Sequence, residues 1–340
     1  MYLSKMPYKL ISILVPFKNT EAFIADCIQS ILQQTYTHWE LIIVDDSSTD
    51  NSFNIVQHFA KNDNRIKLLK NTGTGIIDAL KLAFSKSQGD FITRMDSDDL
   101  MRPNKLEVLL NNLLHHGKQH IATGCVNYFS DKGISAGYKN YQNWLNTLTK
   151  TGSNYTEIYK ECVIPSPCWM IHRDDFIACD AFNPDRYPED YDLTFRFYKQ
   201  QYKCIPCDLI LHDWRDYSYR TSRTHEHYAL NHFIDIKLYY FLDIDYSPNK
   251  TLVLWGAGNK GKKTAKTLIK NQIPFTWVCD NSNKIGCNIY GKILKPFNYL
   301  ETLNKPQSII TVANPNSQIE IKNYLKKIHL NPVTDYIFFC

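Results

Sequence analysis

The segment 94–99 contains three carboxylates within four residues: Asp96, Asp98 and Asp99. It directly follows the apolar run 91–93. Anions this close repel one another, so a positively charged partner must offset them. Carboxylate oxygens are hard ligands that suit Mg²⁺ or Mn²⁺, and such an ion bridges to substrate phosphates. The stretch therefore indicates a metal site for a phosphorylated substrate. The alternative is a solvated acidic turn that caps the next helix.

Strand and helix patterns alternate through the first part of the chain, which predicts an α/β fold with a doubly wound, mostly parallel sheet. In such sheets ligands bind beyond the carboxyl ends of the strands. Asp45 and Asp46 follow one expected strand and the Asp96 cluster follows another, so both should lie at the binding edge. The expected strands are 10–15, 39–44, 66–69, 91–94 and 121–129, and the expected helices are 21–33, 52–61, 76–87 and 106–114.

The composition is that of a globular protein long enough for two domains, with 340 residues, 44% hydrophobic and 21% charged. A net charge of +5 fits an anionic small substrate or an acidic membrane surface, and is too weak to indicate a nucleic-acid partner. No run approaches the ~18 apolar residues needed to cross a bilayer. The first ten residues do not resemble a signal peptide. We therefore expect a cytoplasmic protein, either free or peripheral at the inner face of the plasma membrane.

Four segments together resemble the motifs of family 2 glycosyltransferases, which have the GT-A fold. The resemblance covers about residues 10–223 and implies transfer of a sugar from a nucleotide sugar with inversion at the anomeric carbon. The segments are 15–19, 30–36, 40–50 and 94–99, the last with Pro103 and Leu106 behind it.

The resemblance also implies which residues hold the nucleotide. Asp45 and Asp46 match the acidic pair that holds the base and ribose, while Pro16 and Asn19 match the loop beside the base. Phe17 stands where the family usually has a tyrosine, so the ring is kept and the hydroxyl is lost.

Metal binding is implied by the same resemblance, because Asp96 and Asp98 match the family's Asp-x-Asp motif. Asp98 is the expected ligand of Mn²⁺ or Mg²⁺, and Asp96 is expected to contact the metal, its bound water or the ribose. The metal would neutralise charge on the leaving nucleoside diphosphate. His212 is a candidate for a further metal ligand, with a structural histidine as the alternative.

A second acidic pair, Glu189 and Asp190, matches the Glu-Asp pair at the start of a helix on the family's acceptor side. The acceptor hydroxyl must lose its proton, so a base must lie within hydrogen-bond reach. The resemblance gives this role to Asp190 and an orienting role to Glu189, although acids in a first helical turn also offset the helix dipole. Arg215, Arg220 and Arg223 fall in a segment that looks like the family's closing element, and guanidinium groups match phosphate geometry.

A glycine motif marks the C-terminal part of the chain. Gly256, Gly258 and Gly261 form a GxGxxG between an expected strand, 251–255, and an expected helix, 262–270. Asp280 lies 19 residues after Gly261, close to the ~20 expected of a ribose-binding acid. The segment resembles a small nucleotide-binding-like domain that is fused behind some transferases of this family. A nucleotide site and a structural, oligomerising or partner-docking role are the alternatives.

Three parts of the chain follow: a GT-A catalytic domain at 1–223, a helix and linker at 224–248, and a Rossmann-like domain at 249–340. The expected function is metal-dependent transfer of a sugar from a UDP-sugar to a hydroxyl of a glycan or lipid-linked acceptor, in bacterial cell-surface polysaccharide synthesis. The alternative is a protein or sensor that binds NAD(P) or SAM through the C-terminal domain. A homo-oligomer built through that domain is a further expectation.

Overall fold

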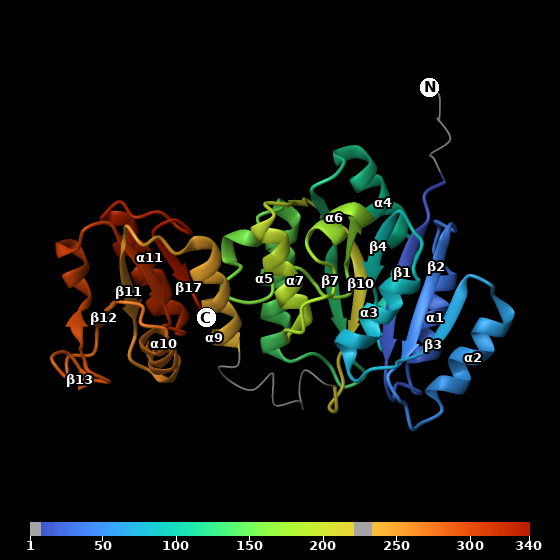
Figure 1. Cartoon of the computed structure of the whole chain (residues 1–340), viewed down its shortest axis with the longest axis horizontal. Helices are drawn as coiled ribbons and strands as arrows, with labels where there is room; N and C mark the ends of the chain where they lie inside the picture. The colour runs from blue at the N-terminus through green and yellow to red at the C-terminus, as the bar shows by residue number, and fades with distance from the viewer. Residues whose placement is uncertain (1–7, 221–232) are drawn as a thin grey trace. The chain divides into compact units, whose positions relative to one another are not determined.

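The computed structural model describes residues 8–220 and 233–340, which separate into two compact units (Figure 1). The first comprises residues 8–154 and 163–220, and the second comprises 155–162 and 233–340. The segment 155–162 was expected in the first domain but belongs to the second unit. The reason is that the Tyr159 ring stacks on Phe339 at 5.6 Å and its hydroxyl donates to Asp245. The predicted residues Arg223 and 224–232 lie outside the described ranges.

A seven-stranded sheet forms the centre of the first unit, in the order β3-β2-β1-β4-β8-β6-β9. Strands β1 to β4 run parallel, whereas β8 is antiparallel to both β4 and β6. The prediction of a mostly parallel doubly wound sheet is thus confirmed. The strands are β1 Ile11–Phe17, β2 Trp39–Asp45, β3 Ile66–Lys70, β4 Phe91–Arg94, β6 His120–Thr123, β8 Trp169–His172 and β9 Lys203–Ile205.

Helices cover this sheet, and the strands β1 and β2 are buried along their whole length. Helix α3 packs against β1 and β2, while α4 packs against β6 and β8. The four helices expected from periodicity are all present, with ends shifted by a few residues. The helices are α1 Ile24–Leu32, α2 Ser52–Asn62, α3 Ile76–Lys86, α4 Lys105–His116, α5 Ala136–Thr151, α6 Arg173–Ala178 and α7 Glu189–Lys199.

A second sheet of three strands lies beside the acidic loop, with β10 Ile210–Arg215 between β5 Leu100–Met101 and β7 Cys125–Phe129. The single strand expected at 121–129 is wrong, because the chain leaves the large sheet at Gly124 and enters the small one. A Cβ at Gly124 would lie 2.5 Å from the Leu211 side chain, so a larger residue could not make this passage. Strand β10 thereby reaches the loop that follows β4.

Strand β1 runs two residues further than expected, through Pro16 to Phe17. Its pairing with β4 ends at Leu14, while its pairing with β2 continues to Phe17. A proline lacks the N–H that a sheet neighbour needs, so it is tolerated where one side of the strand is unpaired. Pro16 therefore lies inside the strand and not in the loop after it.

Five parallel strands form the sheet of the second unit, in the order β15-β12-β11-β16-β17. From β11 the chain adds β12 and β15 on one side, and then returns to add β16 and β17 on the other side. The strand order therefore reverses between β11 and β16. Ligands of doubly wound sheets bind at such a reversal. The strands are β11 Thr251–Trp255, β12 Thr276–Cys279, β15 Lys295–Pro296, β16 Pro306–Ile310 and β17 Tyr336–Phe338, and β13 Asn288–Ile289 pairs with β14 Lys292–Ile293 in a hairpin.

Among the described residues of this unit, the α-helices are α9 Phe233–Tyr240, α10 Asn259–Lys270 and α11 Pro315–Lys327. Helix α10 begins three residues earlier than expected, inside the glycine motif. Of the helix and linker expected at 224–248, the described residues begin with α9, which continues into a π-helical turn at Phe241–Asp245. Within the described ranges, none of the helices is both long and apolar enough to span a membrane.

Candidate active site

Two acidic segments meet at the carboxyl edge of the large sheet. Strand β1 lies between β2 and β4, with Phe17 beside Asp45 and Leu14 beside Arg94. Asp45 and Asp46 therefore flank the end of β1 on one side, and the loop that begins at Asp96 flanks it on the other. The structure places at one edge of the sheet acids that are about fifty residues apart in the sequence, as expected because each group directly follows a strand.

Asp46 and Asp45 are both buried and hold the loops around them. One oxygen of Asp46, Oδ1, accepts hydrogen bonds from Asn71 Nδ2 at 2.7 Å and Gly75 N at 2.9 Å. The other Asp46 oxygen lies 3.4 Å from Lys18 Nζ, and Asp45 Oδ1 accepts from Ser48 N at 3.0 Å. These contacts fix the shape of the edge, and contact of either acid with a nucleotide stays a prediction.

The other residues expected at the nucleotide lie at the end of β1. Phe17 is 3% exposed and belongs to the core, so its ring has little surface to offer. Asn19 has a positive φ of 52° and its Oδ1 accepts from Thr49 N at 2.8 Å. Asn19 thus ties the loop after β1 to the loop after β2, which supports the edge from both strands.

Arg94 links the acidic loop to the start of α7. Its Nη1 donates to Glu189 Oε1 at 2.7 Å, and its Nε and Nη2 donate to Asp96 Oδ1 at 3.1 and 3.0 Å. Arg94 is 4% exposed. Burial alone would lower its pKa, but Asp96, Glu189 and Asp190 outweigh burial and raise it. One guanidinium therefore fixes two acids that lie 93 residues apart in the sequence.

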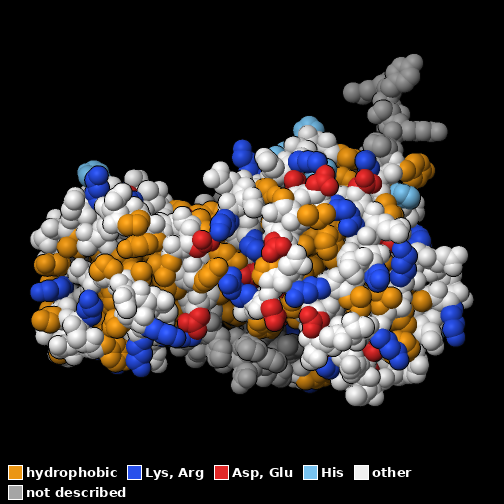
Figure 2. Space-filling view, viewed as in Figure 1, with side chains coloured by type: hydrophobic (Ala, Val, Ile, Leu, Met, Phe, Trp, Pro, Cys, Tyr) orange, Lys and Arg blue, Asp and Glu red, His pale blue; other side chains and the backbone are white. Residues whose placement is uncertain are grey.

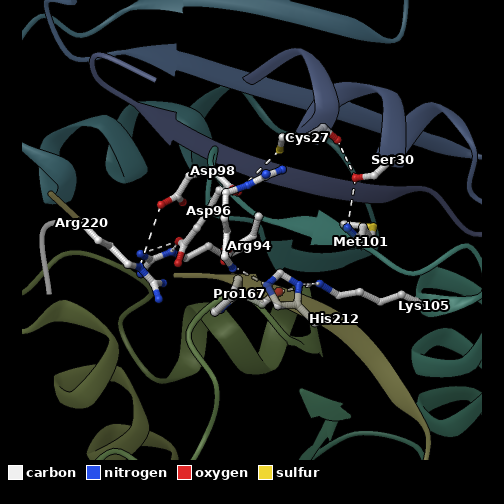
Figure 3. Close-up of polar contacts among 12 residues, drawn as sticks. Cys27, Ser30, Arg94, Asp96, Asp98, Met101, Lys105, Pro167, His212 and Arg220 are labelled. Carbon is white, nitrogen blue, oxygen red and sulfur yellow. Dashed lines mark hydrogen bonds and ion pairs between the residues drawn. The ribbon is translucent and has the colours of Figure 1, made fainter. Parts of the chain in front are cut away.

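Asp98 is a buried carboxylate, and two described side chains approach its Oδ2. Tyr217 donates its hydroxyl to Asp98 Oδ2 at 2.7 Å, and Arg220 Nε lies 4.0 Å from the same atom. Figure 3 shows Arg220 and Asp98 facing each other. Burial, followed by the charge of Asp99, raises the pKa of Asp98 to about 7, although Arg220 opposes this.

Asp99 belongs to a buried chain of polar contacts with His212 and Lys105. His212 Nε2 lies 3.0 Å from Asp99 Oδ2. Its Nδ1 lies 3.3 Å from Lys105 Nζ, which also donates to Pro167 O at 2.5 Å (Figure 3). Burial lowers the pKa of His212 well below its usual range. Both ring nitrogens face protein partners, so this geometry favours the structural alternative for His212 over metal binding.

Arg215 is engaged in holding the acidic loop. Its backbone N donates to Asp99 Oδ1 at 2.8 Å, its Nε donates to Asp98 O at 2.8 Å, and its Nη2 lies 3.3 Å from Asp26 Oδ2. The guanidinium also lies over the Phe23 ring, 4.9 Å from its centroid. A role for Arg215 in binding a diphosphate would require it to exchange some of these contacts.

Glu189 and Asp190 begin helix α7 and differ in their surroundings. Glu189 is buried against Arg94, whereas Asp190 keeps part of its surface exposed. Asp190 Oδ1 accepts from Tyr191 N at 2.8 Å. Withdrawal from solvent, followed by the neighbouring charge of Glu189, raises the pKa of Asp190 to about 7, with Arg94 acting in the opposite direction. A carboxylate with that pKa can accept and release a proton near neutral pH.

Sequence reasoning did not assign roles to Arg94, Asp99 and Tyr217. Arg94 and Asp99 stood inside the acidic stretch, but nothing local shows that one reaches α7 and the other faces a histidine of β10. Tyr217 lies three residues before Arg220, and only the fold brings its hydroxyl to Asp98. The missing signal in each case is a contact between segments far apart in the sequence.

Comparison with known proteins agrees with this geometry. Residues 12–179 match the family described as Glycosyl transferase family 2. The chain is 32% identical over 215 residues to UDP-Glc:alpha-D-GlcNAc-diphosphoundecaprenol beta-1,3-glucosyltransferase WfgD of Escherichia coli, a match that covers 61% of this chain and 77% of that protein.

The chain belongs to glycosyltransferase family 2.

Another glycosyltransferase matches over a shorter stretch. Glycosyltransferase GlyG of Streptococcus pneumoniae serotype 4 is 37% identical over 127 residues, which is 37% of this chain and 42% of that protein. The family match thus lies in the N-terminal part, and the chain spans less than half of this relative's length.

Solved structures share the fold of this glycosyltransferase family member at low identity. Staphylococcus aureus TarS 1–349, in complex with UDP-GlcNAc, has a TM-score of 0.53 at 17% identity and covers 76% of this chain and 71% of its own. Mannosyltransferase PcManGT of Pyrobaculum calidifontis, in complex with GDP-Man and Mn²⁺, has a TM-score of 0.52 at 16% identity and covers 69% of this chain and 63% of its own. The GT-A-like fold expected from the sequence is confirmed.

The acidic loop fits a divalent cation, with the protein supplying few of its ligands. Among the described residues, no group of three or more His, Cys, Asp or Glu side chains is placed to hold a metal. Asp96 and Asp98 can offer carboxylate oxygens at the mouth of the loop, and Mg²⁺ is commonly held by one or two carboxylates plus water and substrate phosphates. The donor set therefore suits an ion that arrives with a phosphorylated substrate.

The predicted C-terminal site residues lie in the second unit, at the carboxyl ends of β11 and β12. Gly256, Gly258 and Asp280 line one cleft there. Gly261 is buried behind it, inside the first turn of α10.

Proposed function

We propose that this family 2 member is an inverting, metal-dependent glycosyltransferase. It transfers a sugar from a UDP-sugar to a hydroxyl of a glycan or lipid-linked acceptor, in the synthesis of a bacterial surface polysaccharide. The E. coli relative supports the choice of substrates, because its name specifies UDP-Glc as donor and a diphosphoundecaprenol-linked sugar as acceptor. An acceptor of that kind would keep the enzyme at the inner face of the membrane.

The observation that carries the proposal is the bridge made by Arg94 between Asp96 and Glu189. A transferase of this type needs a donor side that holds the leaving diphosphate and an acceptor side that takes a proton. Arg94 fixes the acidic loop and the start of α7 relative to each other through one buried, planar group. The donors of a guanidinium are fixed in one plane, so a group that holds two carboxylates at once gives geometric precision as well as binding energy.

On the donor side, Asp98 and Asp96 would hold the metal, and Asp45 and Asp46 would bind the nucleoside. A bound divalent cation supplies neutralisation of the negative charge that develops on the leaving diphosphate. Arg220, close to Asp98, adds positive charge at the same place. Tyr217 and Arg215 keep the loop in the shape that this binding requires.

On the acceptor side, Asp190 would accept the proton of the attacking hydroxyl. The acceptor oxygen forms a bond to the anomeric carbon, the bond from that carbon to the phosphate oxygen breaks, and the nucleoside diphosphate leaves with the bonding electrons. Attack on the face opposite the leaving group inverts the anomeric carbon. Glu189, held by Arg94, orients this end of α7 and does not itself take the proton.

A transfer assay with a panel of UDP-sugars and Mn²⁺ tests the proposal. Asp190→Asn should reduce turnover by about two to four powers of ten, because a positioned base contributes that much. Binding of UDP, measured by calorimetry, should change little. The matched control is Asp185→Asn, which removes the same charge from an exposed position five residues away.

Full activity in Asp190→Asn would reject this residue as the base. Transfer that is unaffected by chelation of divalent cations would reject the metal. Formation of a product with the anomeric configuration of the donor, seen by NMR, would reject inversion.

A further inference from the structure

A cleft of about 460 Å³ lies at the carboxyl edge of the second sheet, outside everything the proposed transfer uses. It is located where the sheet reverses direction, between β11 and β16. Pockets of a few hundred Å³ at such reversals commonly accept nucleotide-sized ligands. Residues 256–260, 279–281 and 311–314, with Lys284, line it.

The three glycines of the motif have three different surroundings. Gly256 has a φ of 92°, which favours glycine, and it makes the turn out of β11. A Cβ at Gly261 would lie 2.0 Å from Gly256 O, so the helix packs on the turn only because this residue has no side chain. At Gly258, in contrast, a Cβ would have no neighbour within 4 Å. Neither the backbone, with φ −81° and ψ −170°, nor protein packing requires a glycine at position 258.

The open space at Gly258 is part of the cleft, so a ligand can approach the backbone there. Gly258 is also the N-cap residue of α10, and no side chain caps that helix. At α11 the equivalent groups are already satisfied, because Asn314 accepts hydrogen bonds from Asn316 N and Ser317 N. The first amides of a helix attract anions, and phosphate groups in particular.

Charge in the part of this unit that carries its five-stranded sheet also favours an anion. Residues 250–340 contain 13 lysines, no arginine and four acids, a net charge of +9 against +5 for the whole chain. On the face shown in Figure 2, lysines are spread over the C-terminal unit at the left. Two of them line the cleft: Lys260 in the first turn of α10, and Lys284, whose Nζ lies 3.2 Å from Ala257 O.

A single acid completes the cleft. Asp280 directly follows β12, at the strand end next to the glycine turn, and its side chain is exposed. A carboxylate at this place would repel a phosphate but can accept two hydrogen bonds from the neighbouring hydroxyls of a ribose. The cleft thus offers amides and ammonium groups at one end and a carboxylate at the other.

We propose that this cleft binds a nucleoside 5′-diphosphate group, separately from the donor site of the first unit. The diphosphate lies over residues 256–260 and the N-terminus of α10, with Lys260 and Lys284 beside it. The ribose hydroxyls bond to Asp280. The group can belong to a free or sugar-linked nucleoside diphosphate or to a dinucleotide, since all share this chemistry.

Hydrogen–deuterium exchange of the full chain, followed by mass spectrometry, tests the proposal with millimolar UDP, ADP or NAD⁺. Peptides that contain residues 256–261 report the cleft, and peptides that contain residues 94–99 report the donor site, so failure at one site is distinguishable from failure at the other. We expect slower exchange at 256–261 with at least one ligand. Protection by UDP or ADP identifies a mononucleotide source, and protection by NAD⁺ alone identifies a dinucleotide.

Two variants locate the effect. Gly258→Val fills the open space without straining the backbone, and it should abolish ligand protection at 256–261 while exchange without ligand stays unchanged in the rest of the unit. Asp280→Asn should weaken binding about tenfold, because a charged hydrogen-bond acceptor is lost. Glu320→Gln, on an exposed part of α11, removes the same charge and should have no such effect.

Absence of protection at 256–261 with all three nucleotides would overturn the proposal, and so would protection that persists in Gly258→Val. If that variant does not fold, Asp280→Asn decides: affinity equal to that of Glu320→Gln would overturn the assignment of the ribose to Asp280 and with it the nucleotide.

Discussion

At the carboxyl edge of the first sheet, buried acids lie in the loop after β4 and at the end of β2. The corresponding edge of the second sheet is formed by glycines, open amides and lysines, with one exposed acid, Asp280. Both edges arise from the same parallel strand order, which brings loops together without regard to their side chains. The first edge suits a phosphate that arrives with a cation. The second suits a phosphate directly. The comparison shows that the fold determines where a ligand can bind. The residues of the loops determine whether its negative charge is neutralised by a metal ion or by groups of the protein.

The largest expected difference between the edges comes from removing an acid. Asp98→Asn should lower transfer about a thousandfold, because several kcal/mol of charge stabilisation by the metal are lost. Stabilisation of the protein by UDP with Mn²⁺, seen as a rise in Tm, should disappear as well. The control is Asp131→Asn, an exposed acid that contributes to neither edge. An Asp98→Asn enzyme that still responds to Mn²⁺ would remove the contrast between the edges.

Arg94 gives the next effect. Arg94→Lys keeps the charge but loses the planar group that holds Asp96 and Glu189 at once, and we expect kcat/KM to fall about a hundredfold through misplacement of the acidic loop and α7. The second unit has no counterpart of this bridge in the described cleft, so nucleotide protection at 256–261 should be unchanged.

The pH profile separates the charge of Arg94 from its geometry. Asp190 works as a base only when it is deprotonated, and its pKa is raised to about 7. We therefore expect kcat/KM to be low at pH values below this pKa and to increase as the pH rises through it. Arg94 lowers that pKa, while Glu189 and Asp96 raise it. Arg94→Gln should therefore move the rising limb to higher pH, and Arg94→Lys should move it less. Identical limbs in the wild type and in Arg94→Gln would contradict the assignment of Asp190.

Substitution by alanine should affect stability strongly at one glycine of the second edge and hardly at another. Gly261→Ala places a Cβ against Gly256 O and should destabilise the unit by about 1–3 kcal/mol. Gly258→Ala, three residues away, meets open space and should leave stability within about half a kcal/mol. Urea denaturation, followed by exchange at residues 251–280, measures both. Equal effects would show that Gly258 is needed for folding and is not kept open for a ligand.

The smallest expected effect concerns the capped helix. Asn314→Ala removes the side-chain cap of α11 and should cost about 1 kcal/mol of stability, whereas Asn314→Ser should cost less, because serine also caps helices. The same urea measurement applies. If Asn314→Ala leaves stability unchanged, the side chain of Asn314 does not stabilise the first amides of α11. The distinction between the N-termini of α10 and α11 would then be lost.

The sequence predicted the strands and helices of the first unit because their apolar residues are periodic and turn residues separate them. It failed at Gly124, where two strands of different sheets follow each other with no turn signal except one glycine. It also placed the end of β1 at Pro16, because a proline usually interrupts a strand. The strand continues through Pro16 because β2 still pairs with it there while β4 does not. No local sequence pattern shows which neighbouring strand pairs at that position.

The site was predictable where its residues are neighbours in the sequence. Asp96 and Asp98 stand out by spacing alone. The role of Arg94 was not predictable, because it depends on a partner on α7. For His212 the decisive fact is that Asp99 and Lys105 occupy both ring nitrogens, which only the packing of β10 against the acidic loop shows.

The segment 155–162 bears on how such a protein can be cut, fused or inherited. Its residues Ile158 and Tyr159 are buried within the second unit, and Lys237 Nζ donates to Lys160 O at 2.8 Å. This segment lies between two parts of the first unit in the sequence, but it packs in the second unit. A stop codon after the transferase motifs would leave that piece without its packing. Exchange of the C-terminal module between genes would succeed only if the recipient carried a matching insert, so the two parts should evolve as a pair.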